Sequence, residues 1–551
     1  MFFPKKNQTE KALMKKITKR KSKSKQQKQA RKIQRGVNKR KKDLFLGKKL
    51  TAEQKKKRSE QLAKRKEAKQ KRRQLKKDNE TTAEIKKIQN AMSSIFNPEM
   101  LNQLAKTTGF IKRTGGEITA FSFMYIVSFG FLGNGAIALT YLVAGLRKHF
   151  NVIVTPQALS KRINSDFSVK FLQAILKKLL EIQLKIRLKN SFTETFSMFN
   201  GIYLQDSTQI TLNETLSEDF KGSGGGASKS AMKLDFICDI TSFLVHGIKI
   251  TSAVINDQTH AKEILKYLKK GGLVIRDLGY FTINVLKSIE DKSAYYISRL
   301  SISTHIYLNQ KDETPLDIPA FLKNLQDQGK SLSNITIYVG KTERLKSRLV
   351  AEKVPAHVSK QRIDRFKKDR KKSASPYYVN WSCFSIFITN IPEEMFSGKM
   401  ILALYKIRWQ IELIIKNFKS NLEIDILKGS KKNRIESLIY GRLITTTVMF
   451  IIQNYAASIA VDKEISGDKV VKFLKSDNQL REAIIHNDMS MLLMVLEHDL
   501  ILICKQKRKR QTTYEYIKNN LADEKDKNSN IMHLDLCVDD KFESNPFQKS
   551  I

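Results

Sequence analysis

Hydrophobic periodicity divides the chain into a short stretch that lacks it and a longer region that has it. Residues 1–91 are rich in Lys, Arg and Gln, with almost no regularly spaced apolar residues. Residues 97–190 have a helical pattern, and Thr155 followed by Pro156 is typical of a helix start. The helix that starts there carries Lys161 and Arg162. It is either a DNA-recognition helix or one basic helix among several.

The pattern changes at about residue 199 to the shorter period of β-strands. Residues 201–206 predict a strand that ends at Asp206, and residues 233–256 predict two more. Thr259–Lys270 is predicted as a helix closed by two glycines. Residues 273–277 then predict a buried strand that ends in a second aspartate, Asp277. Three strands, a helix and a fourth strand indicate an α/β domain.

Beyond residue 281, strand patterns with basic runs extend to about residue 395, and 399–423 and most of 434–505 are strongly helical. Two uncharged stretches, Ile118–Leu146 and Leu443–Val461, exceed the roughly 18 residues that suggest a membrane span. A Gly-Asn-Gly turn interrupts the first, and threonines and amides make the second polar. We therefore expect buried core helices and no membrane partner.

The charge of the chain indicates what kind of partner it binds. The chain has 101 Lys and Arg against 54 Asp and Glu, a net charge of +47. Residues 1–80 alone hold 33 of the basic and 7 of the acidic residues. Such an excess indicates a polyanion, because each neutralised phosphate releases counterions. We expect residues 1–91 to be a disordered basic arm that adds affinity for DNA without sequence preference.

Cysteine usage excludes two other classes. The chain has four cysteines, which lie far apart with no Cys-x-x-Cys pair: Cys238, Cys383, Cys504 and Cys537. This spacing argues against a disulfide framework and against a structural zinc site. With no apolar leader at the N-terminus, it fits a reducing cytoplasm.

Three carboxylates are candidates for chemistry. Asp206 and Asp277 end predicted strands, where sites form in α/β sheets, and Glu412 lies inside a predicted helix. Clusters of carboxylate oxygens suit Mg²⁺ or Mn²⁺, and two such ions support phosphodiester chemistry. Strand-end aspartates also cap turns, so the carboxylates alone leave both interpretations open.

The helix around Glu412 carries a more specific pattern. At about 100° per residue, four polar residues fall on one face within about 60°; they are Tyr405, Arg408, Glu412 and Lys419. Such a stripe is costly to bury without a partner. It could equally be a solvated face with an Arg408–Glu412 ion pair, so periodicity does not decide between the two.

The spacing Tyr-x2-Arg-x3-Glu-x6-Lys resembles the C-terminal motif of a bacterial insertion-sequence family, the IS-four type of DDE transposase. Further blocks in the same order resemble that family's first and second carboxylate blocks, the flanks of its inserted β domain and its N-terminal opening. These blocks are, respectively, Leu204–Thr208, Arg276–Phe281, Ile297–Leu300 with Phe387–Pro392, and Leu104–Arg113. The resemblance covers roughly 97–460, and the family lacks the 1–91 arm.

The resemblance implies an α/β fold with a ribonuclease-H-like catalytic core, a β-rich insertion and flanking helical regions. The expected segments are an arm at 1–91, a helical DNA-binding domain at 92–198, core at 199–280, insertion at 281–398, a core helix at 399–430, helices at 431–517 and a loose tail at 518–551.

The same resemblance implies a function. Asp206, Asp277 and Glu412 would bind two Mg²⁺ ions, with Mn²⁺ as a substitute, and Tyr405, Arg408 and Lys419 would hold the DNA end. The partners would be double-stranded DNA, as element ends and target, and a second copy in a synaptic homodimer, in the bacterial cytoplasm. The alternatives are a ribonuclease-H-like nuclease without strand transfer and a transposon-derived DNA-binding protein without catalysis.

Overall fold

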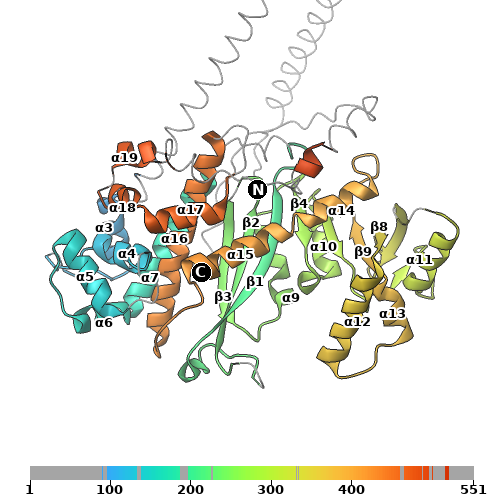
Figure 1. The fold of residues 1–551 in the computed structure, drawn as a ribbon, viewed down its shortest axis with the longest axis horizontal. Helices are drawn as coiled ribbons and strands as arrows, with labels where there is room; N and C mark the ends of the chain where they lie inside the picture. The colour runs from blue at the N-terminus through green and yellow to red at the C-terminus, as the bar shows by residue number, and fades with distance from the viewer. Residues whose placement is uncertain are drawn as a thin grey trace, which may run out of the picture. The chain divides into compact units, whose positions relative to one another are not determined.

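The structure, a computed structural model, describes residues 90, 93 and 96–519, with gaps at 114, 133–137, 186–195, 225–227, 243, 331, 333, 460–464, 487, 496–498 and 500–514. The basic arm, the Gly-Asn-Gly turn and the polar tail therefore lie outside the described residues. Within them, nine strands form a single mixed sheet, and helices pack on both of its faces (Figure 1).

Among the described residues, the helices that precede the sheet are α3 (Pro98–Thr107), α4 (Ala120–Phe129), α5 (Leu139–Phe150), α6 (Pro156–Ile163) and α7 (Asp166–Lys185). Side-chain hydrogen bonds fix the starts of α4 and α6. Thr119 and Ser122 form a capping box at α4, and the Thr155 side chain caps α6. Arg162 of α6 donates to the Phe110 carbonyl at 2.8 Å. It also lies over the Phe110 ring, so this arginine of the suspected recognition helix is engaged within the molecule.

The sheet has the order β3-β2-β1-β4-β5-β9-β8-β7-β6. Its strands are β1 (Ile202–Thr211), β2 (Ala231–Asp239), β3 (Leu244–Ser252), β4 (Leu273–Arg276), β5 (Tyr295–Arg299), β6 (Ile306–Tyr307), β7 (Ile335–Val339), β8 (Leu345–Lys353) and β9 (Phe384–Thr389). Strands β1, β4 and β5 run parallel and the other pairs are antiparallel. The first five strands have the order and directions of a ribonuclease-H-like core, which confirms the predicted fold class.

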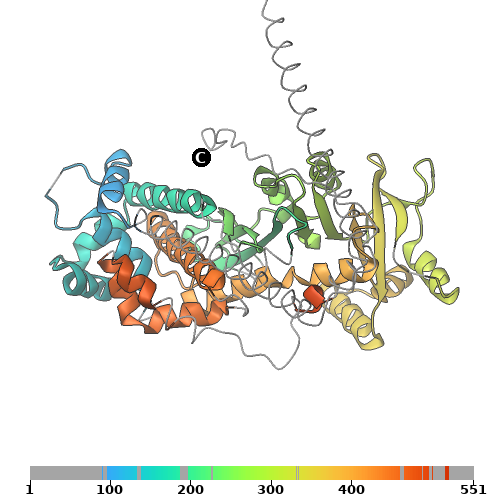
Figure 2. The same cartoon turned by 90° about the horizontal axis from the view of Figure 1, so that it is seen from above.

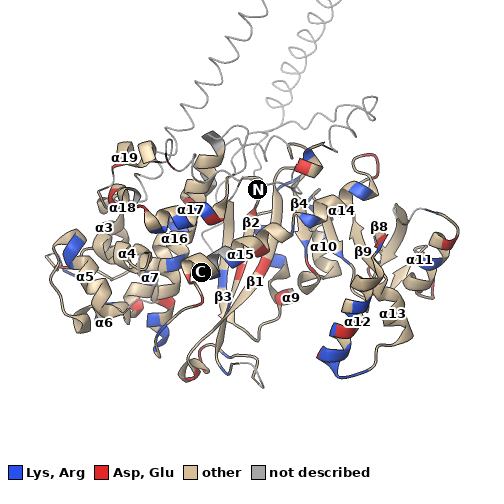
Figure 3. Cartoon of the chain, in the orientation of Figure 1, with Lys and Arg blue, Asp and Glu red and all other residues tan. Residues whose placement is uncertain are grey.

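Further helices lie between β3 and β4, directly after β4, and in the predicted insertion. These are α9 (Asp257–His260), η3 (Ala261–Lys266), η4 (Leu278–Tyr280), α10 (Ile283–Asp291), α11 (Ile318–Asp327), α12 (Ala356–Arg370) and α13 (Pro376–Ser382). The single helix predicted at Thr259–Lys270 was wrong, because this segment is one α-turn followed by a 3₁₀ helix. Strands β6–β9 extend the core sheet rather than forming a sheet of their own. Basic side chains gather on α12 (Figure 3).

The chain after the sheet is helical: α14 (Gly398–Lys406), α15 (Trp409–Leu422), α16 (Lys432–Ile459), α17 (Gly467–Ser476), α18 (Asn478–Ile485) and α19 (Met489–Met494). Helix α16 packs along α7, as Figure 2 shows from above. By length and composition α16 could cross a membrane, but 89% of its apolar window is buried inside the molecule. Some of its polar residues find internal partners, since the Thr445 hydroxyl donates to the Ser128 carbonyl and the Thr447 hydroxyl to the Leu443 carbonyl. Burial within the protein accounts for its apolar character.

Alternate residues of the central strands feed two hydrophobic clusters. Leu204 and Ile275 face the cluster formed with α3–α7 and the C-terminal helices. Tyr203 and Val274 face the second cluster, formed with η3, α10 and α11. This alternation is the two-residue period of a strand buried on both faces. It fixes the rotation of β1 and β4, and therefore the direction in which Asp206 and Asp277 point.

Candidate active site

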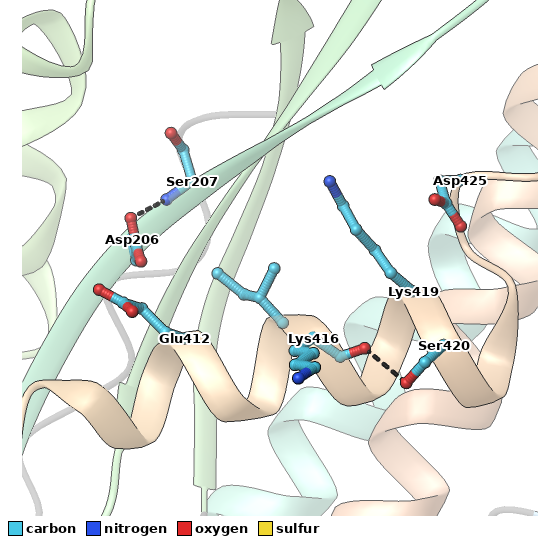
Figure 4. Close-up of a pocket in the computed structure, with 8 residues that line it drawn as sticks. Asp206, Ser207, Glu412, Lys416, Lys419, Ser420 and Asp425 are labelled. Atoms are coloured by element: carbon cyan, nitrogen blue, oxygen red, sulfur yellow. Dashed lines mark hydrogen bonds between the residues drawn. The ribbon is translucent and has the colours of Figure 1, made fainter. Parts of the chain in front are cut away.

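Three separate elements bring the candidate carboxylates to one edge of the sheet. Asp206 lies on β1, and Asp277 follows the last residue of the neighbouring parallel strand β4. Glu412 lies in the first turn of α15, which crosses β1 (Figure 1). Figure 4 shows the Asp206 and Glu412 side chains pointing toward one another. The carboxyl ends of parallel strands are where α/β sheets form sites.

Arg408 lies among these carboxylates. Its guanidinium contacts Glu412 Oε1 at 2.5 Å, and its Nε lies 4.0 Å from Asp277 Oδ1. The Tyr405 hydroxyl donates to the same Asp277 oxygen at 3.4 Å. Because the Arg408 side chain is only 17% exposed, this is not the solvated surface ion pair that the sequence left open. The polar stripe faces other polar groups of the same molecule.

The titration of these groups reflects their crowding. Burial raises the pKa of Asp206 to about 6, and the charges of Asp277 and Glu412 also raise it. A hydrogen bond from the Ser207 main chain and the charge of Arg408 partly oppose this rise in pKa. The raised pKa of Asp206 therefore reflects mainly its burial, with a smaller contribution from the two neighbouring carboxylates.

The same carboxylates also shift the pKa values of their neighbours Arg408 and Tyr405. Burial tends to lower the pKa of Arg408, but the nearby Asp277 and Glu412 carboxylates outweigh it, so the pKa is raised. Burial raises the pKa of Tyr405, and the negative charge of Asp277 adds to the effect. Arg408 therefore stays a cation and Tyr405 a hydrogen-bond donor at neutral pH.

The motif residues do not lie on one continuous helix, and that part of the prediction was wrong. The helix is interrupted at Ile407 and Arg408, between α14 and α15. Each of these residues bonds to a carbonyl three residues earlier, as in a 3₁₀ turn. This tighter turn alters the helical phase only slightly. Tyr405 at the end of α14 and Glu412 on α15 therefore still reach the same carboxylate cluster.

Lys419 lies two turns further along α15, beside a cavity of about 500 Å³. The cavity is lined by Asp206, Ser207, Glu412, Ile415, Lys416, Lys419, Ser420 and Asp425 (Figure 4). Lys419 Nζ donates to the Gln209 carbonyl of β1 at 3.2 Å. The cavity thus joins the carboxylates at one end to a lysine at the other, an arrangement suited to a phosphate backbone.

The three carboxylates have the chemistry of a divalent-cation site, but they do not lie close enough together to hold one ion. Carboxylate oxygens are the ligands that hard divalent cations prefer. Across the described residues, no three acidic or histidine side chains lie close enough together to hold an ion as they stand. Arg408 supplies the positive charge between Asp277 and Glu412. An ion held by all three carboxylates would require Arg408 to give up part of these contacts.

Residues beside the aspartates form contacts that sequence reasoning missed. The Ser207 main chain donates to Asp206 Oδ1 at 2.8 Å, and its hydroxyl donates to Asp257 at 2.9 Å. Asp257 in turn pairs with the buried Lys233 at 2.9 Å. The sequence contained only a weak signal for them, namely a lysine at a position of β2 that the strand pattern buries.

A sheet of ribonuclease-H-like order, with one carboxylate on its first strand, one directly after its fourth strand and one on a later helix, is the arrangement expected of DDE enzymes. The family described as "Transposase DDE domain" matches residues 198–448. These residues therefore match a transposase DDE domain, and the match supports an enzyme of the DDE transposase class. Dependence on a divalent metal ion follows from that class. The match includes all six candidate residues.

Curated relatives extend the similarity beyond the domain. The chain is 28% identical to the transposase for insertion sequence element IS231F of Bacillus thuringiensis subsp. israelensis, over 66% of this chain and 78% of the relative. It is also 28% identical to the transposase for IS1151 of Clostridium perfringens, over 70% and 84%. The transposase for IS231C of B. thuringiensis subsp. berliner is 26% identical over 77% and 92%.

Among solved structures, a piggyBac transposase synaptic complex with hairpin DNA is similar over 79% of this chain and 85% of that chain. The TM-score is 0.39 and the sequence identity 12%.

Proposed function

We propose that this protein is the transposase of a bacterial insertion sequence, which cuts the element's ends and joins them to target DNA. The observation that carries the proposal is that Asp206, Asp277 and Glu412, from three different elements, all interact with Arg408 inside the region that matches the transposase DDE domain. Plain DNA binding requires no such carboxylate cluster. The similarity to insertion-sequence transposases over most of the chain supports the same conclusion.

In this proposal the three carboxylates hold two Mg²⁺ ions, which Mn²⁺ can replace. Bound ions of this kind activate an attacking water or 3′ hydroxyl and stabilise the leaving oxygen of a phosphodiester. The chain's own residues hold the DNA. The Arg408 guanidinium can bond a phosphate in bidentate fashion, and Lys419 neutralises a neighbouring phosphate along the cavity. Tyr405 stays protonated and donates a hydrogen bond beside Asp277.

We further propose that two copies act together on double-stranded DNA in the cytoplasm. An element has two ends, and each joining event needs a catalytic site. A homodimer that holds both ends in one synaptic complex meets this need with a single type of chain. Sedimentation of the protein with and without end DNA measures the number of copies per complex.

The proposal is tested by incubating the full chain with linear DNA that carries the element's two ends, in Mg²⁺. We expect both cleavage at the ends and covalent joining to a second DNA. Cleavage without joining would indicate a ribonuclease-H-like nuclease, and binding without either would indicate a DNA-binding protein without catalysis. Asp277→Ala serves as the control, because it removes a carboxylate but no phosphate contact.

A further inference from the structure

The main-chain hydrogen bonds between β1 and β4 stop short of the two catalytic aspartates. The register of this parallel pair runs from Ile202 and Leu273 to Leu204 and Ile275. Asp206 and Asp277 each lie two residues beyond that last pair. The β1–β4 ladder therefore does not by itself fix the distance between the two carboxylates.

The next two side chains bridge the strands where the ladder ends. Gln205 is 2% exposed and Arg276 is 1% exposed, and a guanidinium nitrogen of Arg276 donates to Gln205 Oε1 at 3.4 Å. Each residue directly precedes one aspartate. Because side chains alternate along a strand, the bridge lies on the face of the sheet opposite to the carboxylates. It links β1 to β4 from behind the site.

Gln205 is also tied to β2. Its amide nitrogen donates to Asp235 Oδ1 and to the His260 carbonyl, each at 3.0 Å. Asp235 is 2% exposed and accepts a further hydrogen bond of 2.6 Å from the Tyr280 hydroxyl. Tyr280 lies in η4, three residues after Asp277, so one carboxylate joins β2 to the turn that follows the second aspartate.

Arg276 fixes the same turn from its other side. It donates to the Tyr280 carbonyl at 2.9 Å and to the Ala261 carbonyl at the junction of α9 and η3. The chain is thereby fixed on both sides of Asp277. Arg276 precedes it and donates these hydrogen bonds, and Tyr280 follows it and is bonded through its carbonyl and its hydroxyl. The Asp206 side of the site is held in the same way, since Ser207 is bonded to Asp257.

Such a network is a costly way to build a core. Burial of a cation, a carboxylate, an amide and a phenol must be compensated by hydrogen bonds, and apolar residues of similar volume often give equal or greater stability. A network that is satisfied by several partners gives rigidity and a defined geometry instead. In this protein that geometry is the separation of two adjacent carboxylates.

We propose that Gln205 and Arg276 are positioning residues, which set the separation of Asp206 and Asp277 and so prepare them to share a divalent metal ion. The inference rests on the proposed function, which assigns these two aspartates as metal ligands. Neither positioning residue touches DNA or metal. Groups that orient metal-binding side chains in this way change metal affinity or activity by about 10–100-fold when replaced.

The test is titration of Mn²⁺ alone into the metal-free full chain, without DNA, with bound ion measured by electron paramagnetic resonance. Gln205→Met keeps the side-chain volume but removes the links to Arg276 and Asp235. We expect its Kd for Mn²⁺ to rise about 10–100-fold. Tyr280→Phe removes the hydroxyl bond to Asp235 but leaves the link between Gln205 and Arg276 in place, so a smaller rise in Kd is expected. Thermal melts establish that each variant is folded.

Gln183→Met is the matched control. Gln183 is also fully buried, and its amide donates to the Val245 carbonyl at 2.8 Å, far from the aspartates in sequence. It should lower the melting temperature as Gln205→Met does but leave the Mn²⁺ affinity unchanged. A purely structural role for Gln205 predicts that the two variants behave alike.

Asp277→Asn separates failure of this inference from failure of the proposed function. If Asp277→Asn loses Mn²⁺ binding while folded Gln205→Met binds Mn²⁺ as tightly as wild type, the positioning role is overturned and the site stands. If Asp277→Asn binds Mn²⁺ normally, the metal site itself is wrong. Should Gln205→Met fail to fold, an unchanged Kd in Tyr280→Phe overturns the positioning role.

Discussion

Helices α12 and α15 both carry charged residues but use them differently. On α12 the charged side chains are exposed and spread around the helix, and the basic ones dominate its last turn. On α15 and the turn before it, Arg408 and Glu412 are half-buried and lie among carboxylates from β1 and β4. Helix α12 carries eight charged residues and α15 only three, so the number of charges does not mark the site. What distinguishes α15 is that Glu412 and the preceding Arg408 lie beside carboxylates of other elements.

The exception on α12 supports this distinction. Arg362 is partly buried and donates to the Ser382 and Phe384 carbonyls at 3.2 and 2.8 Å. These contacts fasten α12 to β9 and leave the guanidinium with acceptors of the fold itself. Arg408 instead contacts two carboxylates that compete for it. A partly buried arginine indicates a candidate site when more than one carboxylate contacts it, so that its single positive charge does not neutralise them all.

The largest expected difference between the two helices is catalytic. Asp277→Ala removes a metal ligand, so end cleavage should fall about 10³-fold or more, which corresponds to the loss of several kcal/mol of transition-state stabilisation. DNA binding, measured by gel shift, should survive. Asp364→Ala on the exposed face of α12 is the control and should cleave as wild type. Normal Mg²⁺-dependent cleavage by Asp277→Ala would rule out the carboxylate assignment.

A charge-conserving change tests geometry rather than charge. Arg408→Lys keeps the cation but loses the planar fork that can bind a phosphate through two hydrogen bonds. Cleavage should fall about 10–100-fold, as for loss of a well-placed donor. The free energy of unfolding should change by about 1 kcal/mol or less.

The matched change on α12 is Arg365→Lys, at an exposed position, which should leave both cleavage and stability unchanged. If Arg408→Lys is also stable and fully active, Arg408 does not grip DNA. If Arg408→Lys is strongly destabilised, its role is structural, like that of Arg362 on α12.

The third prediction uses the raised pKa of Asp206, about 6. Between its ordinary pKa near 4 and this value, the native state keeps a proton that the unfolded state has lost. Stability therefore falls as pH rises through this window, and the loss is complete above it. Asp206→Asn should stabilise the metal-free protein by about 1–2 kcal/mol at pH 7.5, after allowance for partial exposure. At pH 4 the two proteins should unfold alike.

Chemical denaturation at both pH values, with and without Mg²⁺, checks this. Added Mg²⁺ should stabilise wild type and not Asp206→Asn, because a ligand stabilises only a state that binds it. Equal stability of the metal-free proteins at pH 7.5 would show that burial does not raise the pKa of Asp206 or make its ionised form costly.

The elements that carry the site could be predicted because their signals are local. The apolar run before Asp277 correctly predicts β4, and the order of strands and helix gives the α/β class. The strand predicted to end at Asp206 instead continues to Thr211, so only its start was correct. Packing of α16 within the molecule followed from its polar residues, such as Thr445. Each of these inferences depends on residues close together in sequence.

The features that could not be predicted depend on long-range contacts. The break at Ile407 keeps nearly the same helical phase, so periodicity cannot detect it. The bond between Gln205 and Arg276 requires knowledge that β1 and β4 are neighbours. Likewise, β9 pairs with β5, which attaches the insertion to the core sheet, and no local pattern encodes that pairing.

The smallest expected effect compares one lysine on each helix. Lys419 lines the cavity beside the carboxylates, whereas Lys368 lies on the exposed face of α12. Each phosphate contact adds about 0.9 to the slope of log affinity against log salt. Lys419→Ala should therefore flatten the slope for end DNA by about 1 and slow cleavage only partly. Its stability should be nearly unchanged, because the bond to the Gln209 carbonyl is exposed. Lys368→Ala should leave the slope unchanged if α12 does not touch DNA. An equal change of slope in both variants would show that α12 also binds the backbone, and the contrast between the helices would then be limited to catalysis.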